Sequence, residues 1–121
     1  MITLKNVDKI YGKGEGAVHA LKNVNLTIED GKFTAIIGKS GSGKSTLMNI
    51  IGALDSPTNG EVMAGSLILN KLSSNQLAEY RNKNTGFIFQ SFYLEPTFTV
   101  LDNVAMPLTI AGVDRKERED R

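Results

Sequence analysis

The sequence contains no cysteine, so neither a disulfide framework nor a thiolate metal site is possible. Its charges nearly cancel, with 14 basic and 13 acidic residues, and this balance gives no electrostatic reason to expect nucleic acid as a direct partner. No apolar run approaches the length of a membrane span, and the first residues lack the apolar core of a signal peptide. We therefore expect a cytoplasmic chain that reaches a membrane only through a partner.

The length and hydrophobic content bound the fold. At 121 residues the chain is one domain's worth of sequence or less. Its hydrophobic content of 40% is ordinary for a globular protein, which argues against disorder.

One stretch, Gly38–Thr46, matches the phosphate-binding pattern G-x-x-x-x-G-K-[ST]. Its glycines let the backbone curl tightly, so that N–H groups can form a nest for phosphate oxygens at the start of a helix. Lys44 would bring a positive charge to the β- and γ-phosphates, and the Ser45 hydroxyl would be a hard oxygen ligand for Mg²⁺. Thr46 adds a donor near the α-phosphate.

The flanks of this stretch favour a true phosphate loop, which must follow a strand and open a helix. Phe33–Ile37 is predicted to be a short buried strand that leads into Gly38. Apolar residues then recur at helical spacing, at Leu47, Ile50, Ile51 and Leu54. A flexible Gly/Ser linker is the alternative, and these ordered flanks argue against it.

The first 31 residues predict a small antiparallel sheet. Ile2 to Val7 suggests a first strand, 17–21 a second, and the alternation over 23–28 a half-buried third. A glycine-rich loop, 11–16, separates the first two, and Asp30-Gly31 is a strong turn signal.

After the predicted phosphate-loop helix, turn residues fill 55–60, and 61–64 and 66–69 are predicted strands. Ser73 and Gln76 have the capping-box spacing, so a helix should run to about Arg81. Phe87–Phe89 is predicted to be an apolar strand ending at Gln90.

The last thirty residues should be a loop and two helices. Residues 91–98 are rich in aromatics and read as a loop. Thr99, with Asp102 three residues on, should start a helix that Pro107 kinks or interrupts and Ala111-Gly112 closes. Residues 114–121 suggest a charged helix.

These motifs together resemble the N-terminal half of an ABC transporter ATP-binding domain over essentially the whole chain. Tyr11, the loop Gly38–Thr46, the string Gly86–Gln90 and Thr99–Val104 carry the resemblance. The sequence as a whole is most similar to the subgroup that serves lipoprotein release, macrolide export and antimicrobial-peptide export, a subgroup that also includes a cell-division relative.

The resemblance implies roles for individual residues. Tyr11 would stack on adenine, and Gln90 would contact Mg²⁺ or the attacking water. The predicted catalytic residues are therefore Gln90 and Lys44. The predicted metal ligands are Ser45 and Gln90. His19, the only histidine, is interpreted as an ordinary strand residue. The predicted ATP-binding residues are Tyr11, Gly38, Ser40, Gly41, Ser42, Gly43, Lys44, Ser45 and Thr46.

The implied fold class is α/β, a phosphate-loop core of ABC type. We expect an antiparallel β part over 1–32, an α/β core over 33–90 and the start of a helical subdomain over 91–121. Such domains are about twice this length, and the second half of the pattern, with its Walker B carboxylate, catalytic Glu, signature motif and switch His, is not in the sequence. We therefore expect a truncated domain that hydrolyses no ATP by itself. Glu95, where the subgroup usually has an apolar residue, leaves the membrane partner open.

The expected function is that of an ATP-binding subunit. In a dimer with a second ATP-binding domain, it would hydrolyse ATP·Mg²⁺ to drive export or extraction through membrane permease subunits, at the inner face of the cell membrane. One alternative is an ABC-type ATPase acting in cell division or on nucleic acid, without transport. Another is a phosphate-loop enzyme that phosphorylates a metabolite or switches on GTP, although neither an acceptor lid nor a guanine-reading motif is evident.

Overall fold

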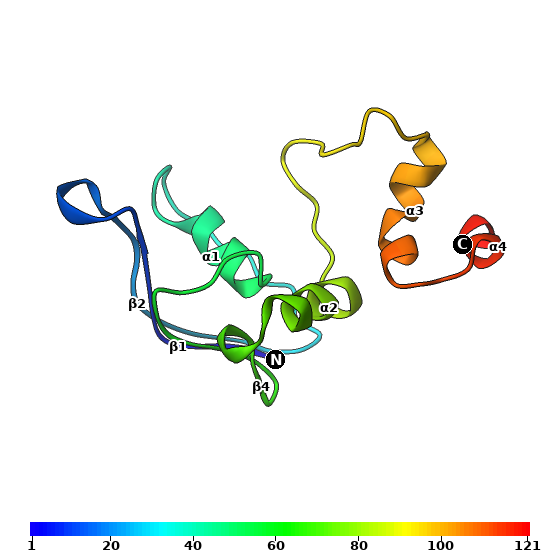
Figure 1. Cartoon of the computed structure of the whole chain (residues 1–121). Helices are drawn as coiled ribbons and strands as arrows, with labels where there is room; N and C mark the ends of the chain where they lie inside the picture. Colours follow the sequence, from blue (N-terminus) through cyan, green and yellow to red (C-terminus); the bar gives the residue numbers. More distant parts are fainter. The chain divides into compact units, whose positions relative to one another are not determined.

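A computed structural model describes all residues from 1 to 121 (Figure 1). The chain forms two compact units, Met1–Leu77 and Ala78–Arg121, which are described separately. Both α-helices and an antiparallel sheet are present, so the fold is of the expected mixed α/β class.

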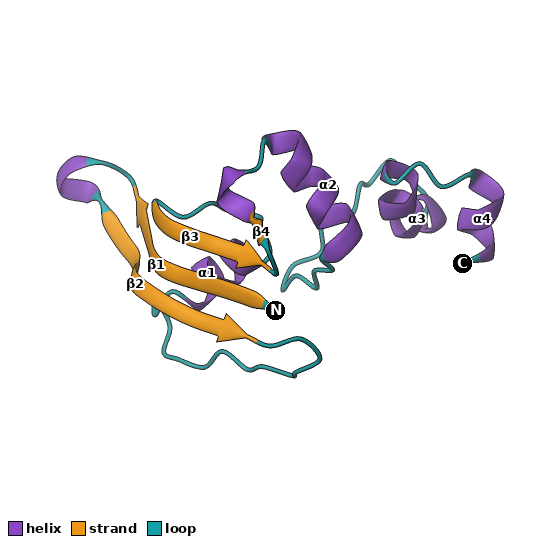
Figure 2. Cartoon of the chain, turned by 90° about the horizontal axis from the view of Figure 1, so that it is seen from below, coloured by secondary structure: helices purple, strands orange, loops and turns teal.

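The first unit contains a four-stranded sheet with the order β2-β1-β3-β4, in which every neighbouring pair is antiparallel (Figure 2). The strands are β1 (Ile2–Tyr11), β2 (Val18–Ile28), β3 (Asn59–Ala64) and β4 (Leu67–Ile68). A short 3-10 turn, η1 (Gly14–Gly16), joins β1 to β2 where the sequence predicts a glycine-rich loop. In the centre of the sheet Leu4 lies opposite Leu26 on one side and Val62 on the other.

Two strands predicted for 17–21 and 23–28 are in fact one strand, β2. The predicted break, at residue 22, is next to Asn23, whose φ of 48° is in the left-handed region. A residue in this conformation shifts the register and lets the strand continue, as in a β-bulge. The pairing of β1 with β2 shows such shifts between Leu4 and Ile10.

The core of the first unit lies between the sheet and helix α1 (Lys44–Ile51), which contacts β2. Leu4, Val7, Ile50 and Val62 are the largest fully buried side chains. Each such burial contributes about 1.5–3 kcal/mol, so the sheet and α1 stabilise one another. The helix ends at Ile51, earlier than the predicted end near Leu54, and Gly52 is its C-cap.

Between β3 and α2 (Ser74–Asn84), the strand predicted over 66–69 forms only as the two-residue β4, and a 3-10 turn follows it. The turn η2 (Leu69–Lys71) is fixed by Asn70, whose side chain accepts from Val62 N at 2.9 Å and donates to Gly60 O at 3.2 Å. The predicted capping box before α2 is confirmed, because Gln76 Oε1 accepts from Ser73 N at 2.9 Å. The helix continues three residues past the predicted end at Arg81.

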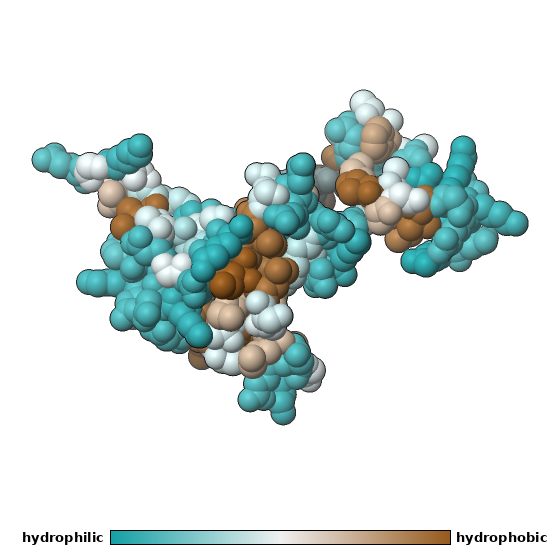
Figure 3. Space-filling model, turned by 60° about the horizontal axis from the view of Figure 1, so that its bottom comes forward, coloured by the Kyte–Doolittle hydropathy of each residue, from teal (hydrophilic) through white to brown (hydrophobic).

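The predictions of strands at Phe33–Ile37 and Phe87–Phe89 are wrong, because neither segment pairs with another strand. Phe33 is 99% exposed and Ile37 91% exposed, so the first segment is not buried either. Figure 3 shows apolar surface left open on one face of the chain. An apolar run predicts that a segment can be a strand, but a strand forms only where a neighbour supplies backbone hydrogen bonds.

The second unit contains α3 (Val100–Ile110) and α4 (Arg115–Asp120). The predicted helix start at Thr99 is confirmed, and Thr99 and Asp102 form a capping box in which Asp102 N donates to Thr99 Oγ1 at 3.1 Å. Pro107 does not interrupt the helix as expected; it removes one backbone donor, and the helix continues to Ile110. None of the helices combines the length and apolar character needed to cross a membrane.

Candidate functional site

The phosphate-loop motif forms a tight turn directly before α1. Gly43 is the N-cap of α1, with a φ of 86° that favours glycine. A Cβ at Gly43 would lie 2.6 Å from Ala20 O of β2, and one at Gly38 would lie 2.5 Å from Ser42 Oγ. Glycine is therefore required at Gly43 for both its backbone conformation and its close approach to the sheet.

Lys44 folds back over the loop that precedes it. Its Nζ donates to Gly38 O at 2.9 Å and to Lys39 O at 2.7 Å. A lysine ammonium carries three N–H donors, so one remains for an anion. The charge is thus held at the mouth of the turn.

The start of α1 leaves further donors without partners inside the helix. The first helical bond of α1 runs from Leu47 N to Gly43 O at 2.8 Å. The N–H groups of residues 44–46 precede it, and such groups at a helix N-terminus attract anions. The hydroxyls of Ser45 and Thr46 lie on the same turn.

A hollow of about 400 Å³ lies in front of this turn. It brings Tyr11, at the end of β1, together with the loop, although 27 or more residues separate them in sequence. Its lining is completed by three residues of β2 and seven of the loop and helix start: Val18, His19, Ala20, Ser40, Gly41, Ser42, Gly43, Lys44, Ser45 and Thr46.

Two charged residues hold Tyr11. Its hydroxyl donates to Asp55 Oδ2 at 2.8 Å, and Lys9 Nζ lies 4.8 Å from the ring centroid. Lys9 Nζ also donates to Asp55 Oδ1 at 2.5 Å and to Ser56 O at 2.7 Å. Partial burial tends to raise the pKa of Asp55, but the hydrogen bonds from Lys9, Tyr11 and Ser56 N outweigh it and leave this pKa below its usual value.

His19 lies on β2 as predicted, but it also lines the hollow, which the sequence did not indicate. Its Nε2 is 3.1 Å from Asp8 Oδ1, and that oxygen also accepts from Asn23 N at 2.9 Å. The backbone bond from Asn23, followed by the bond to His19, lowers the pKa of Asp8. Only the cross-strand pairing of His19 with Ile10, next to Tyr11, could have located it.

Gln90, the other predicted catalytic residue and metal ligand, belongs to the second unit. In the sequence it lies between Phe89 and Tyr93, two members of a small aromatic cluster in which Phe89 stacks on Phe87 at 5.4 Å and meets Tyr93 edge-on at 5.0 Å. Ser45 belongs to the first unit, so a magnesium site shared by Ser45 and Gln90 remains a prediction.

A glycine-rich loop that leads into the N-terminus of a helix packed on a sheet is typical of phosphate-loop nucleotide-binding proteins. Comparison with known proteins narrows this class, because the family model described as "ABC transporter" matches residues 21–121. The chain belongs to the ABC transporter family.

Three relatives illustrate the match. The "Uncharacterized ABC transporter ATP-binding protein MJ0796" of Methanocaldococcus jannaschii is 48% identical, over 98% of this chain and 53% of its own length. A LolD "Lipoprotein-releasing system ATP-binding protein" of Geobacter metallireducens is 46% identical, over 97% of this chain and 52% of its own. A MacB "Macrolide export ATP-binding/permease protein" of Mannheimia succiniciproducens is 48% identical, over 98% of this chain and 18% of its own.

A dimeric structure of MJ0796, described as a post-hydrolysis state bound to ADP and Pi, superposes with a TM-score of 0.89 at 47% identity. The alignment covers 99% of this chain and 53% of that one. The fold is therefore that of an ABC cassette, and the chain spans about half the length of the cassettes it matches.

Proposed function

We propose that this chain is the ATP-binding part of an ABC system that exports or extracts a substrate through membrane permease subunits. The observation that carries the proposal is the hollow in the first unit, which joins an aromatic ring, Tyr11, to the phosphate loop. The aromatic ring suits the base of a nucleoside triphosphate, and the backbone N–H groups with the ammonium suit its phosphates.

Different residues of the hollow would bind different parts of the nucleotide. Lys44 would donate its remaining N–H to the terminal phosphates while its bonds to Gly38 and Lys39 hold it in place. The N–H groups at the start of α1 would bind the other phosphate oxygens, and Thr46 would donate near the α-phosphate. Tyr11 would stack on the base.

The donors at the helix start fit a triphosphate with its magnesium ion. Ser45 would hold Mg²⁺ through its hydroxyl, a hard oxygen ligand of the kind that this ion prefers, and Gln90 would be the second protein ligand. Mg²⁺ bound there would neutralise charge on the phosphates. Lys44 adds to that neutralisation, and Gln90 would orient the attacking water.

The relatives support the rest of the proposal. MJ0796 has been solved as a dimer, which is consistent with a second ATP-binding domain that closes over the nucleotide. The LolD and MacB relatives are named for lipoprotein release and macrolide export, which favours export or extraction. In the complete dimer, hydrolysis would change the shape of the permease subunits and drive transport.

The test measures the ATP affinity of the Lys44→Ala variant of the natural protein. The loss of one charge-assisted phosphate contact should weaken ATP by roughly tenfold to a hundredfold, equivalent to about 1.5–3 kcal/mol. Titration calorimetry with ATP and Mg²⁺ measures both proteins.

Lys39→Ala is the matched control, because it removes a lysine from the same loop but keeps the backbone carbonyl that Lys44 uses. Its affinity should stay close to that of the unaltered protein. Equal affinities for the unaltered protein and Lys44→Ala would show that Lys44 does not bind phosphate and that this function is wrong.

A further inference from the structure

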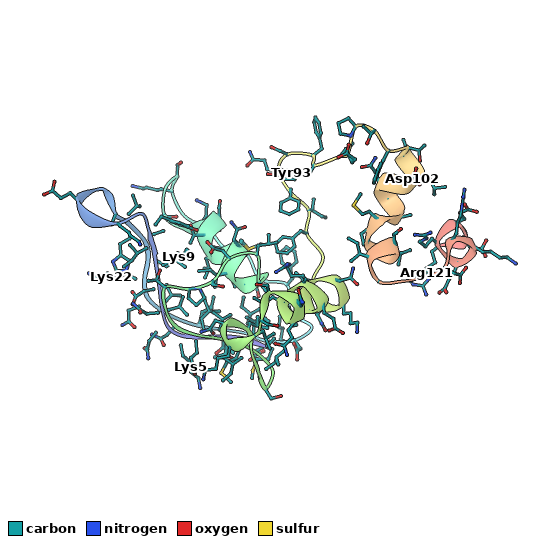
Figure 4. The ribbon with its side chains drawn as sticks, viewed as in Figure 1. Lys5, Lys9, Lys22, Tyr93, Asp102 and Arg121 are labelled. Carbon is teal, nitrogen blue, oxygen red and sulfur yellow. The ribbon has the colours of Figure 1, made fainter.

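We propose that Asp55 and Lys9 are positioning residues for the nucleotide base, which hold the Tyr11 ring at the edge of the hollow with one face left open. The inference rests on the proposed function and adds to it two residues outside the phosphate-loop motif. Figure 4 labels Lys9 on the strand that leads to the hollow.

Three contacts join these residues into one closed cluster. The Tyr11 hydroxyl donates to one oxygen of Asp55, and Lys9 Nζ donates to the other. The ammonium of Lys9 also lies over the Tyr11 ring, 4.8 Å from its centroid. Each member therefore contacts both of the others, which restricts the rotation of the ring more than one hydrogen bond would.

Burial makes this cluster firmer than an ordinary surface pair. The Lys9 side chain is 12% exposed and that of Asp55 29%. In the pair formed by Lys71 of η2 and Glu61 of β3, the side chains are 63% and 40% exposed. Exposed pairs are screened by water and contribute little. Lys9 also donates to Ser56 O at 2.7 Å, so its ammonium is fixed from two sides.

The position of Asp55 in the chain connects the cluster to the phosphate loop. Asp55 lies just after α1, the helix whose first turn carries the phosphate loop. Asp55 N donates to Asn49 O of that helix at 3.2 Å. The cluster therefore ties the ring on β1 to the same helix that holds the phosphate donors, and sets the distance between ring and phosphate loop.

Lys9 also decides which ring face is available. Lys9 and Tyr11 are two residues apart on β1, and alternate residues of a strand point to the same side. Because the ammonium covers one face of the ring, a base can stack only on the opposite one. A cation on one face and a base on the other is a compatible pair of contacts.

The experiment compares ATP with tripolyphosphate, which offers the phosphates without a base. Asp55→Ala should weaken ATP by roughly three- to tenfold, since part of a stacking contact is lost, and leave tripolyphosphate unchanged. In a Tyr11→Ala background the same substitution should change ATP affinity by less than about twofold, because the ring it positions is gone. Titration calorimetry on the natural protein and its variants measures each of these affinities.

Two further variants complete the design. Glu61→Ala breaks the pair between Glu61 of β3 and Lys71 of η2, outside the hollow, and this variant should bind both ligands as the unaltered protein does. Tyr11→Phe removes only the hydroxyl that Asp55 accepts, and should lower ATP affinity alone by roughly two- to threefold. If Asp55→Ala does not fold, Tyr11→Phe decides, and an unchanged ATP affinity there overturns the inference.

The remaining outcomes separate this inference from the proposed function. An Asp55→Ala variant that binds ATP normally, or that loses ATP and tripolyphosphate equally, overturns the positioning role while Lys44-dependent binding stands. A protein that binds neither ligand, or binds both without Lys44, overturns the proposed function and this inference with it.

Discussion

Tyr11 is the residue that, in the proposed function, would bring a base to the sheet. Its ring lines the hollow, and its hydroxyl is already used by Asp55. A phenol ring offers a π-face to any base, so stacking alone should not distinguish ATP from GTP.

We therefore predict that Tyr11→Ala weakens ATP and GTP alike, by on the order of tenfold, because base stacking is worth about 1–3 kcal/mol. Tyr11→Trp and Tyr11→Phe keep a ring and should stay within about threefold of the unaltered protein. Competition of both nucleotides against a fluorescent analogue measures the series. If Tyr11→Phe were as damaging as Tyr11→Ala, the hydroxyl would matter more than the ring and stacking would be the wrong explanation.

The loop before α1 is the element whose shape depends most on a single residue type. Gly43 and Gly41 both have positive φ, at 86° and 76°. They differ in their surroundings, since a Cβ at Gly43 would collide with Ala20 O, whereas nothing lies within 4 Å of a Cβ at Gly41.

This difference predicts unequal costs. Gly41→Ala adds only the strain of a left-handed alanine, about 1–2 kcal/mol. Gly43→Ala adds a clash with the backbone of β2 and should cost a further 1–3 kcal/mol or so. Urea unfolding without nucleotide measures both. Equal costs would show that the loop does not pack on β2 as the structure has it.

The elements that the sequence predicted correctly are those whose signals are local. The predicted capping box at Ser73 and the predicted helix start at Thr99 each depend on a side chain three residues away, and both form. The phosphate-loop helix also begins where the motif requires. These features depend on neighbours within one helical turn, which the sequence itself specifies.

The wrong predictions concern segments whose structure depends on distant partners. Phe33–Ile37 and Phe87–Phe89 are apolar, yet neither has a strand beside it. The sequence does not predict the cluster around Tyr11 for the same reason. Asp55 lies 44 residues from Tyr11, and its sequence neighbours indicate only a turn. Pairings of this kind follow from the packed fold, and one sequence does not specify them.

At the scale of the whole molecule, the chain covers about half of the cassettes it resembles. Large apolar side chains stay exposed in both units, among them Phe33 and Ile88. Large exposed apolar patches are typical of interaction sites and ligand-binding grooves. The division into 1–32, 33–90 and 91–121 stays a prediction about the complete cassette.

The central claim is that ATP lies across the hollow, with its phosphates on the loop and its base on Tyr11. A crystal structure of the protein, as its host makes it, with Mg²⁺ and a non-hydrolysable ATP analogue tests this directly. We predict phosphate oxygens within hydrogen-bond distance of Lys44 Nζ and of the N–H groups at the start of α1, and the base on the Tyr11 face that Lys9 leaves open. A nucleotide bound elsewhere, or phosphates out of reach of Lys44, would contradict the account.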